Sequence, residues 1–338
     1  MKNYLAVFLL AFTPSFNLFA DTVQLKSGDT LTGKIKLIDG DKLLLETDFA
    51  GTITINTDKV KTFAMDAPVT VKQGLFAQSH QADKIVATNS NQIELINGSN
   101  ATTLPMANNL TILPVKTAKL DLSDFIINGF LNAGAYYNKG NSKSEQYSLN
   151  GNMTMRYDLW RHTGDANIFR SRSDGDTSSY YYTLQYDVDR FFTPSFFWKS
   201  NIHYGHDWIE DIKTSKSINT GPGWQVWDNE LSSLSLATLL GYQRLDYRNG
   251  DDASQLLGTL RWDYNHYFLG KTIDLFTNGT VGRSFNDNVD LDLSATAGLA
   301  YRLSSQISLN TSFTKANKKT TNGNSNNTNY NIGVGVNW

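Results

Sequence analysis

Hydrophobic and polar residues alternate along the last two thirds of the chain, over stretches longer than most soluble strands. Between residues 147 and 159 the odd positions are mainly apolar and the even positions are mainly polar, and the alternation recurs at 256–264, 289–301 and 327–338. Strict alternation predicts β-strands whose two faces meet different environments. Membrane-spanning strands need about 9–11 residues, whereas soluble strands typically have about 5–6, so these lengths favour a membrane barrel.

The pattern continues from residue 125 to residue 338 and predicts about twelve strands, an even number, as in single-chain bacterial barrels. Polar connections such as 138–143 and 317–328 alternate with tighter ones such as 161–164 and 193–194. Outer-membrane barrels show this asymmetry between long extracellular loops and short periplasmic turns. The expected fold is therefore all-β, with a transmembrane antiparallel β-barrel of about 12 strands at 125–338.

The final stretch predicts the strand that closes this barrel against the first one. One face of the stretch is apolar and consists of Tyr330, Ile332, Val334, Val336 and Trp338. An alternating strand that ends on an aromatic residue resembles the carboxy-terminal assembly signal of outer-membrane barrels, and this resemblance implies the barrel-assembly machinery as a partner. Pro222 interrupts another predicted strand, at 215–228, where we expect a bulge or a break because proline lacks the backbone N–H.

Residues 21–118 have a different texture, with short strands separated by Gly, Asp and Asn turns. The segment that begins with Val69-Thr-Val71 aligns with the segment that begins with Val23-Gln-Leu25. We interpret 21–118 as a small periplasmic β domain, with a possible tandem repeat of one β unit.

Residues 1–20 predict a signal peptide. Lys2 is followed by the apolar run "YLAVFLLAF" at 4–12, and Ala20 suits the cleavage site. The mature protein is then exported, and its strands are the only segments long enough to span a membrane.

Composition excludes several kinds of protein. The chain has no cysteine, which excludes a disulfide framework, a thiolate metal site and a lipid-anchored amino-terminal cysteine. The formal net charge is −2, or −3 without residues 1–20, whose only charged residue is Lys2. Nucleic-acid-binding domains are usually basic, so no nucleic-acid partner is expected. No pattern indicates a cofactor.

Four segments carry a resemblance to a known family: "GDTLTGKI" at 28–35, "LLLETDFAGTITI" at 43–55, "RFFTPSFFW" at 190–198 and "GPGWQVW" at 221–227. On these segments the chain resembles the salt-induced outer-membrane protein family, a group of unknown function. The likeness covers most of 21–338. It implies a link to osmotic or salt conditions and transfers no catalytic or binding residue.

The polar face of the predicted barrel carries charges of both signs. Two interpretations remain open: rings of charge that tune the selectivity of a pore, or a salt-bridged network that fills the lumen. The expected lumen-lining charges are Arg156, Asp158, Asp187, Asp189, Lys199, His203, Arg261, Asp263, Asp274, Asp290, Asp292 and Arg302.

Enzyme chemistry finds little support in the sequence. The segment "HYGHD" at 203–207 brings His206 next to Asp207, as in an outer-membrane protease with Asp251 and Asp252 as the second pair, but neighbouring residues of a strand point to opposite faces. No Ser/His/Asn constellation suggests a phospholipase. Asp-rich turns such as "NGDDA" at 249–253 do not match a calcium-loop spacing and are expected to be solvated turns. No catalytic, cofactor or metal residues are predicted.

The function predicted from sequence is a narrow passive pore for small solutes or ions. The alternative is a barrel without transport that anchors the periplasmic domain in the envelope. Either protein would reside in the outer membrane of a Gram-negative bacterium and contact its lipid and lipopolysaccharide.

Overall fold

The structure is a computed structural model that describes residues 20–74, 79–89, 91–106, 109–115, 125–139, 143–285, 289–304, 306–320 and 323–338, with residues 289 and 290 described by their backbone alone. The chain divides into two compact units between Pro114 and Val115. The predicted signal peptide lies outside the described residues, apart from Ala20. Among the described residues, no helix is long and apolar enough to cross a membrane.

The first unit is made of short strands whose pairing order occurs twice. β1 pairs with β2 and β5, and in the same way β6 pairs with β7 and β11, while β3 and β9 each lie between the strands that precede and follow them. The side chains of Ile35, Phe63, Ile85 and Ile112 are fully buried between the strands and form part of one apolar core. The strands are β1 (Asp21–Leu25), β2 (Thr30–Asp39), β3 (Lys42–Thr47), β4 (Gly51–Asn56), β5 (Val60–Ala64), β6 (Val69–Gln73), β7 (His80–Ala82), β8 (Lys84–Ala87), β9 (Gln92–Asn97), β10 (Asn100–Pro105) and β11 (Leu110–Pro114).

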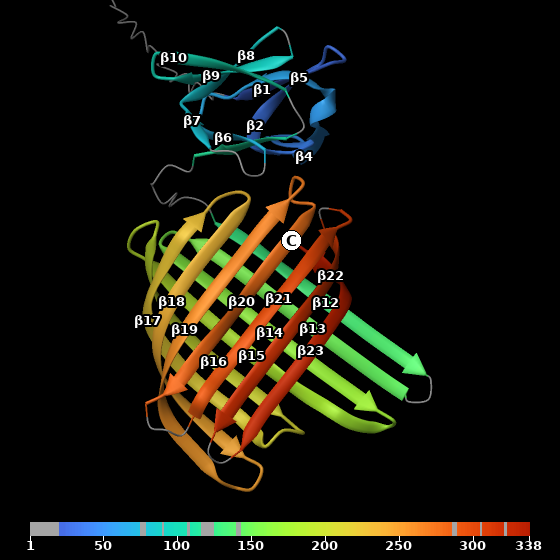
Figure 1. The fold of residues 1–338 in the computed structure, drawn as a ribbon, viewed down its shortest axis with the longest axis vertical. Coiled ribbons are helices and arrows are strands. Elements are labelled where there is room, and N and C mark those ends of the chain that lie inside the picture. The colour runs from blue at the N-terminus through green and yellow to red at the C-terminus, as the bar shows by residue number, and fades with distance from the viewer. Residues whose placement is uncertain are drawn as a thin grey trace, which may run out of the picture. The chain divides into compact units, whose positions relative to one another are not determined.

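The second unit is a closed antiparallel barrel of twelve strands within the described part of the chain, as predicted (Figure 1). Each strand pairs with the next one along the chain, and the last pairs with the first. The strands are β12 (Ile126–Lys139), β13 (Lys143–Tyr157), β14 (Trp160–Ser173), β15 (Asp176–Phe191), β16 (Phe196–Asp207), β17 (Ile212–Asp228), β18 (Ser232–Tyr247), β19 (Asp252–Phe268), β20 (Ile273–Ser284), β21 (Val289–Arg302), β22 (Ile307–Thr320) and β23 (Asn324–Asn337).

The alternation of the sequence becomes the two faces of the barrel. Large apolar side chains such as Leu184, Ile202 and Leu240 point outward and are about half exposed, at 49%, 53% and 54%. Their neighbours along the same strands, Asp187, Asn201 and Gln243, point inward and are buried. An apolar outer surface and a polar interior are typical of transmembrane barrels.

Two ends of the barrel can be distinguished by the chain termini. We call the end where β12 begins and β23 finishes the proximal end, and the opposite end the distal end. The proximal connections are 158–159, 192–195, 229–231, 269–272 and 303–306, and the distal connections are 140–142, 174–175, 208–211, 248–251, 285–288 and 321–323.

The predicted difference in connection length is wrong. Polar segments that the sequence marks as loops are drawn into the strands: β22 runs to Thr320 and β23 begins at Asn324, so only 321–323 remain of the predicted loop at 317–328. Pairing satisfies the backbone N–H and C=O groups of polar residues as well as those of apolar ones, so a polar run can extend a hairpin.

The expected bulge or break at Pro222 is also not found at that position. β17 is continuous, and Thr220 with Leu240 and Gly223 with Ala237 keep one register across it. Gly221 and Pro222 have no β18 partner in this ladder, and the nearest register shift lies between Gln225 and Trp227. The strand therefore tolerates the proline by omitting two pairs.

Candidate functional site

A cavity of about 1160 Å³ occupies the barrel interior and reaches both ends. Its lining includes Asp228 and Lys271 at the proximal end and Asp207 and Asn327 at the distal end. Polar and charged side chains from all twelve strands line this cavity, so the lumen is a polar channel.

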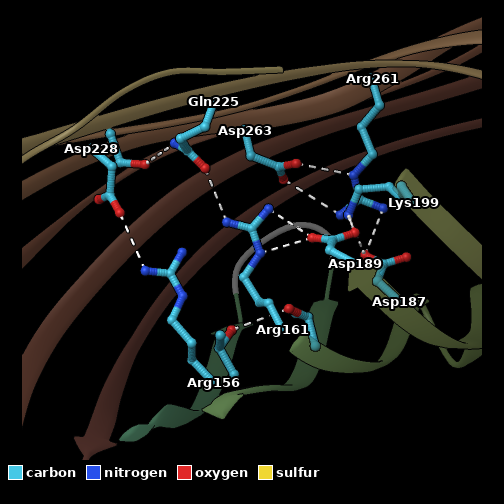
Figure 2. Close-up of polar contacts among 12 residues, drawn as sticks. Arg156, Arg161, Asp187, Asp189, Lys199, Gln225, Asp228, Arg261 and Asp263 are labelled. Atoms are coloured by element: carbon cyan, nitrogen blue, oxygen red, sulfur yellow. Dashed lines mark hydrogen bonds and ion pairs between the residues drawn. The ribbon is translucent and has the colours of Figure 1, made fainter. Parts of the chain in front are cut away.

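Acidic and basic side chains of β13–β19 form what we call the charged belt (Figure 2). Nη2 of Arg161 lies 2.7 Å from Oδ2 of Asp189, and Nζ of Lys199 lies 2.9 Å from its Oδ1. The Asp189 side chain is 1% exposed and that of Lys199 is 4% exposed. A buried charge without a partner of opposite sign is strongly destabilising, so each of these side chains needs the others to remain buried in its charged form.

Asp187 is the centre of the charged belt. Its carboxylate lies 3.0 Å from Nη1 of Arg261 and 3.7 Å from Nζ of Lys199. It also accepts hydrogen bonds from the amides of Gln185 and Asn201. Arg261 in turn donates to Asp263, at 3.1 Å. One carboxylate thus links strands β15, β16 and β19.

Three contacts of the belt are chords across the lumen rather than contacts between neighbouring strands. Arg261 on β19 reaches Asp187, four strands away. Arg156 on β13 reaches Asp228 on β17 at 3.5 Å, and Arg161 on β14 donates to Gln225 on β17 at 3.1 Å. The belt therefore narrows the channel in its proximal half.

Aromatic rings support the guanidinium groups of the belt. Arg161 lies over Phe191 and Phe197, with its Cζ atom 5.0 Å and 5.1 Å from the two ring centroids. Phe197 is fully buried, and Phe191 is 3% exposed. The rings stabilise this position of the Arg161 guanidinium by cation–π contact.

A second narrowing, which we call the distal clasp, joins opposite walls near the distal end. Its contacts connect strands four or five apart around the barrel. They are Tyr181 with Asn329, Asp207 with Asn327 (3.4 Å), Ser215 with Lys318 (3.3 Å) and Tyr247 with Thr320 (2.9 Å).

The wall formed by β12 and β20–β23 differs from the belt, because uncharged amides and hydroxyls line its middle. Asn310 donates to Asn132 at 2.7 Å, and Thr296 lies 2.9 Å from Thr314. Asn331 also lines the cavity. We call this uncharged middle part the neutral wall; the charges of the same strands that line the cavity lie nearer the two ends, with Asp274 and Arg302 on the proximal side and Asp292 and Lys318 on the distal side.

Ten of the twelve charges expected in the lumen line the cavity. Asp158 does not, and the expectation for it is wrong: β13 ends at Tyr157, and Asp158 occupies the turn to β14 with φ 52°. The side chain of Asp290 lies outside the described residues. The ten are Arg156, Asp187, Asp189, Lys199, His203, Arg261, Asp263, Asp274, Asp292 and Arg302.

Sequence analysis missed Arg161, Asp165, Gln225, Asp228 and Lys318. Arg161 was assigned to a turn, whereas the structure pairs it with Arg156 across the hairpin, so both point inward. The two-residue turn at 158–159 was the available signal, because it fixes which residues of the two strands face each other.

The residues of the protease hypothesis are separated and engaged elsewhere. His206 stacks edge-on against Trp208, while Asp207 accepts hydrogen bonds from the N–H groups of Ile209 and Glu210. Burial, followed by the Asp207 carboxylate, raises the pKa of Glu210. Asp252 pairs with Arg244 at 2.7 Å. Within the described residues, no group of three potential ligands is placed to hold a metal ion.

A family model described as "Protein of unknown function, DUF481" matches residues 131–338. The chain belongs to this family. The DUF481 segment begins within β12 and runs to the last residue, so it contains the charged belt and the distal clasp. Its description assigns no function, and the expected link to salt is not part of it. No curated protein matches the chain.

This DUF481 protein is similar to solved structures of β-barrel proteins, at low sequence identity and low TM-score. The translocator domain of autotransporter NalP from Neisseria meningitidis is 12% identical, with 65% of this chain and 91% of that chain covered and a TM-score of 0.37. The NanC porin is 9% identical, with coverages of 62% and 99% and a TM-score of 0.38. The β domain of the Bordetella autotransporter BrkA is 10% identical, with coverages of 63% and 98% and a TM-score of 0.32.

Proposed function

We propose that this DUF481 protein is a narrow passive pore for small polar solutes or ions in the outer membrane of a Gram-negative bacterium. One observation carries the proposal: a single polar cavity is lined by residues from both ends of the barrel. A barrel filled by its own side chains would divide this cavity into separate pockets.

The chemistry of the lumen indicates which solutes pass. Each cation of the charged belt faces at least one carboxylate, so the belt offers donors and acceptors in pairs rather than one sign of charge. Selectivity depends on the charges around the narrowest point. We therefore expect small hydrophilic solutes of either sign, with size as the main filter.

Permeation through liposomes tests the proposal. The protein refolded into liposomes should admit small neutral polar solutes and exclude disaccharides and larger sugars, as measured by the rate of osmotic swelling. Protein-free liposomes and liposomes with heat-denatured protein are the controls. Swelling rates equal to those of the controls for every solute, with folding verified, would contradict a passive pore.

Location and partners belong to the same proposal. The export signal expected at 1–20 and the apolar outer surface support insertion into the outer membrane, with lipid and lipopolysaccharide around the barrel. The alternating last strand supports recognition by the barrel-assembly machinery, and the even number of strands supports a periplasmic position for residues 21–118. The resemblance to the salt-induced family supports a further part of the proposal, that the protein is expressed under osmotic or salt stress.

The second candidate is an envelope protein whose barrel anchors the first unit without transport. The chords of the belt and the distal clasp favour it, because both join strands that are not neighbours and so cross part of the lumen. Deletion of 21–114 separates the two candidates: a pore still conducts without the first unit, whereas an anchor loses its phenotype. Folding of the shortened protein is checked by its heat-dependent shift in electrophoresis.

A further inference from the structure

The seam between the first and last barrel strands is paired over a small part of its length. Phe130, Leu131, Asn132 and Ala133 of β12 pair with residues 334–337 of β23, which makes four pairs, whereas β12 and β13 form fourteen. Two further hydrogen bonds, each 3.1 Å, join Gly129 with Trp338. Beyond this proximal segment β12 and β23 are not paired, and Figure 1 shows the distal ends of β12 and β13 extending past the other strands of the barrel.

The separated edges bear the apolar side chains that face lipid elsewhere in the barrel. Ile332, Tyr330 and Tyr137 are 79%, 69% and 61% exposed, more than the outward-facing leucines of the other strands. Unpaired backbone groups cost several kcal/mol each in hydrocarbon and are tolerated only beside a water-filled cavity or a partner. The unpaired part of the seam is therefore unusual for a membrane barrel, and it is bordered on its inner side by the lumen.

Two glycines lie where the strands begin to separate. A side-chain Cβ on Gly134 would lie 2.7 Å from the carbonyl oxygen of Ile332, and one on Gly333 would lie 3.2 Å from Cα of Gly134. The backbones can approach this closely only because neither residue has a side chain. Continuing the register of Ala133 with Val334 would pair Ala135 with Ile332 and Tyr137 with Tyr330, all on the outer face. The glycine pair thus lies where the pairing ends, and the register of the four pairs can be extended beyond it.

The two sides of the open seam have complementary chemistry. On the inner side lies the neutral wall, where Asn132, Asn310 and Asn331 offer amide donors and acceptors to the cavity. On the outer side lie Tyr137, Tyr330 and Ile332. A molecule that spans the seam would place an uncharged polar head against the amides and an apolar tail among the aromatic side chains.

We propose that the β12–β23 seam is a lateral gate through which amphipathic molecules with an uncharged polar head and an apolar tail pass between the lumen and the lipid bilayer. The inference rests on the proposed function, because the gate requires a lumen that a solute can enter. It extends that function from small solutes to amphiphiles, and it assigns the neutral wall to their head groups.

A removable lock on the seam tests the gate. The chain has no cysteine, so a Tyr137→Cys/Tyr330→Cys variant of the full chain has a single possible disulfide, which forms only when the seam is closed. The probe is an alkyl glucoside with a photoreactive diazirine on its head group, applied to the protein in liposomes. The labelled residues are mapped by mass spectrometry with the pair reduced and oxidised. Ala135→Cys/Ile332→Cys is the second variant if the first fails to fold.

The matched control is Thr238→Cys/Leu260→Cys, a pair that the structure already joins across β18 and β19 on the outer face. We expect labelling of the neutral wall, at or near Asn132 and Asn331, when the seam pair is reduced, and loss of that labelling when it is oxidised. Reduction should restore the labelling, and the control should show no dependence on oxidation. Labelling that is identical with the seam locked and unlocked, or confined to the outer face, would overturn the gate.

Ion conductance of the same samples distinguishes the two proposals. Conductance with labelling that does not depend on the seam would overturn the gate and leave the pore. Labelling that depends on the seam in a protein that never conducts would support the gate and overturn the passive pore for ions.

Discussion

At the scale of single residues, Asp187 links most of the charged belt. It is 1% exposed and has Arg261, Lys199 and two amides as partners. Removing one partner of a buried ion pair typically costs about 3–5 kcal/mol, because the other charge stays buried and uncompensated. In a water-filled lumen, mobile anions offset part of the cost of leaving Arg261 and Lys199 without this carboxylate. The main effect of removing Asp187 is then on the net charge that passing ions encounter.

Asp187→Asn should therefore shift the pore towards anions. The side chain keeps its shape, while Arg261 and Lys199 lose one negative neighbour. We expect the reversal potential under a salt gradient to move in the direction of anion preference. Asp252→Asn, which removes a carboxylate from the outer face, is the control and should leave the reversal potential unchanged. A reversal potential that Asp187→Asn does not move would contradict the placement of the belt at the constriction.

Gly223 tests the packing beneath the belt. A Cβ at this position would overlap the ring of Phe197, which contacts the guanidinium of Arg161. Gly223→Ala should destabilise the barrel by about 1–3 kcal/mol, since overpacking a rigid site forces the ring to move. Gly164→Ala is the matched control, because nothing lies within 4 Å of its Cβ position. Urea unfolding followed by tryptophan fluorescence measures the difference, and equal midpoints for the two variants would contradict the packing described.

Side-chain direction is the residue-scale property that the sequence predicts best. Alternation places Asp187, Asp189 and Lys199 on one face, and the cavity lining contains all three. It does not reveal which residues meet across the lumen: Arg261 and Asp187 lie on strands that never touch. It also misplaces Asp158, because alternation carries no information about where a hairpin turns.

At the scale of elements, the closing strand depends on its last residue. Trp338 exchanges two backbone hydrogen bonds with Gly129. Its ring packs so closely over Gly129 that a Cβ on this residue would lie 2.5 Å from the ring. Trp338→Ala should lower the folded fraction, because a seam of four pairs loses the side chain that covers its proximal end. Tyr330→Ala, in the part of β23 that pairs with β22 but not with β12, should fold almost as the unmodified protein does. The heat-dependent shift in electrophoresis measures the folded fraction, and similar values for both variants would contradict this role of Trp338.

The distal clasp is a second feature at this scale. Asn329 is buried and donates to Tyr181 across the lumen. Asn329→Ala should widen the distal mouth and increase single-channel conductance, while Asn326→Ala, whose side chain contacts Lys315 on the outer face, should not. An unchanged or smaller conductance in Asn329→Ala would show that the clasp does not restrict ion flow.

Strand number and order follow from the sequence because each strand is long and regularly alternating. The ends of the strands do not: β14 begins at Trp160, although residues 161–164 were predicted to form a connection. Polar residues near a turn are equally compatible with loop and hairpin, and pairing with the neighbouring strand decides between them.

At the scale of the whole molecule, the sequence predicts two regions of different texture, and the chain divides after Pro114 into two compact units. Neither the chords of the belt nor the partly open seam could be predicted, because both depend on how the sheet curves and closes. A local hydrophobic pattern specifies which face of a strand meets lipid, but not the distance between opposite walls.

The central claim is that this lumen conducts, and single-channel recording of the refolded 21–338 protein in a planar bilayer tests it most directly. The structure predicts small, discrete and reproducible conductance steps, with weak preference for either ion sign, since the belt charges are paired. A protein with verified folding that never produces such steps would contradict the pore. It would show that the belt and the clasp together seal the barrel.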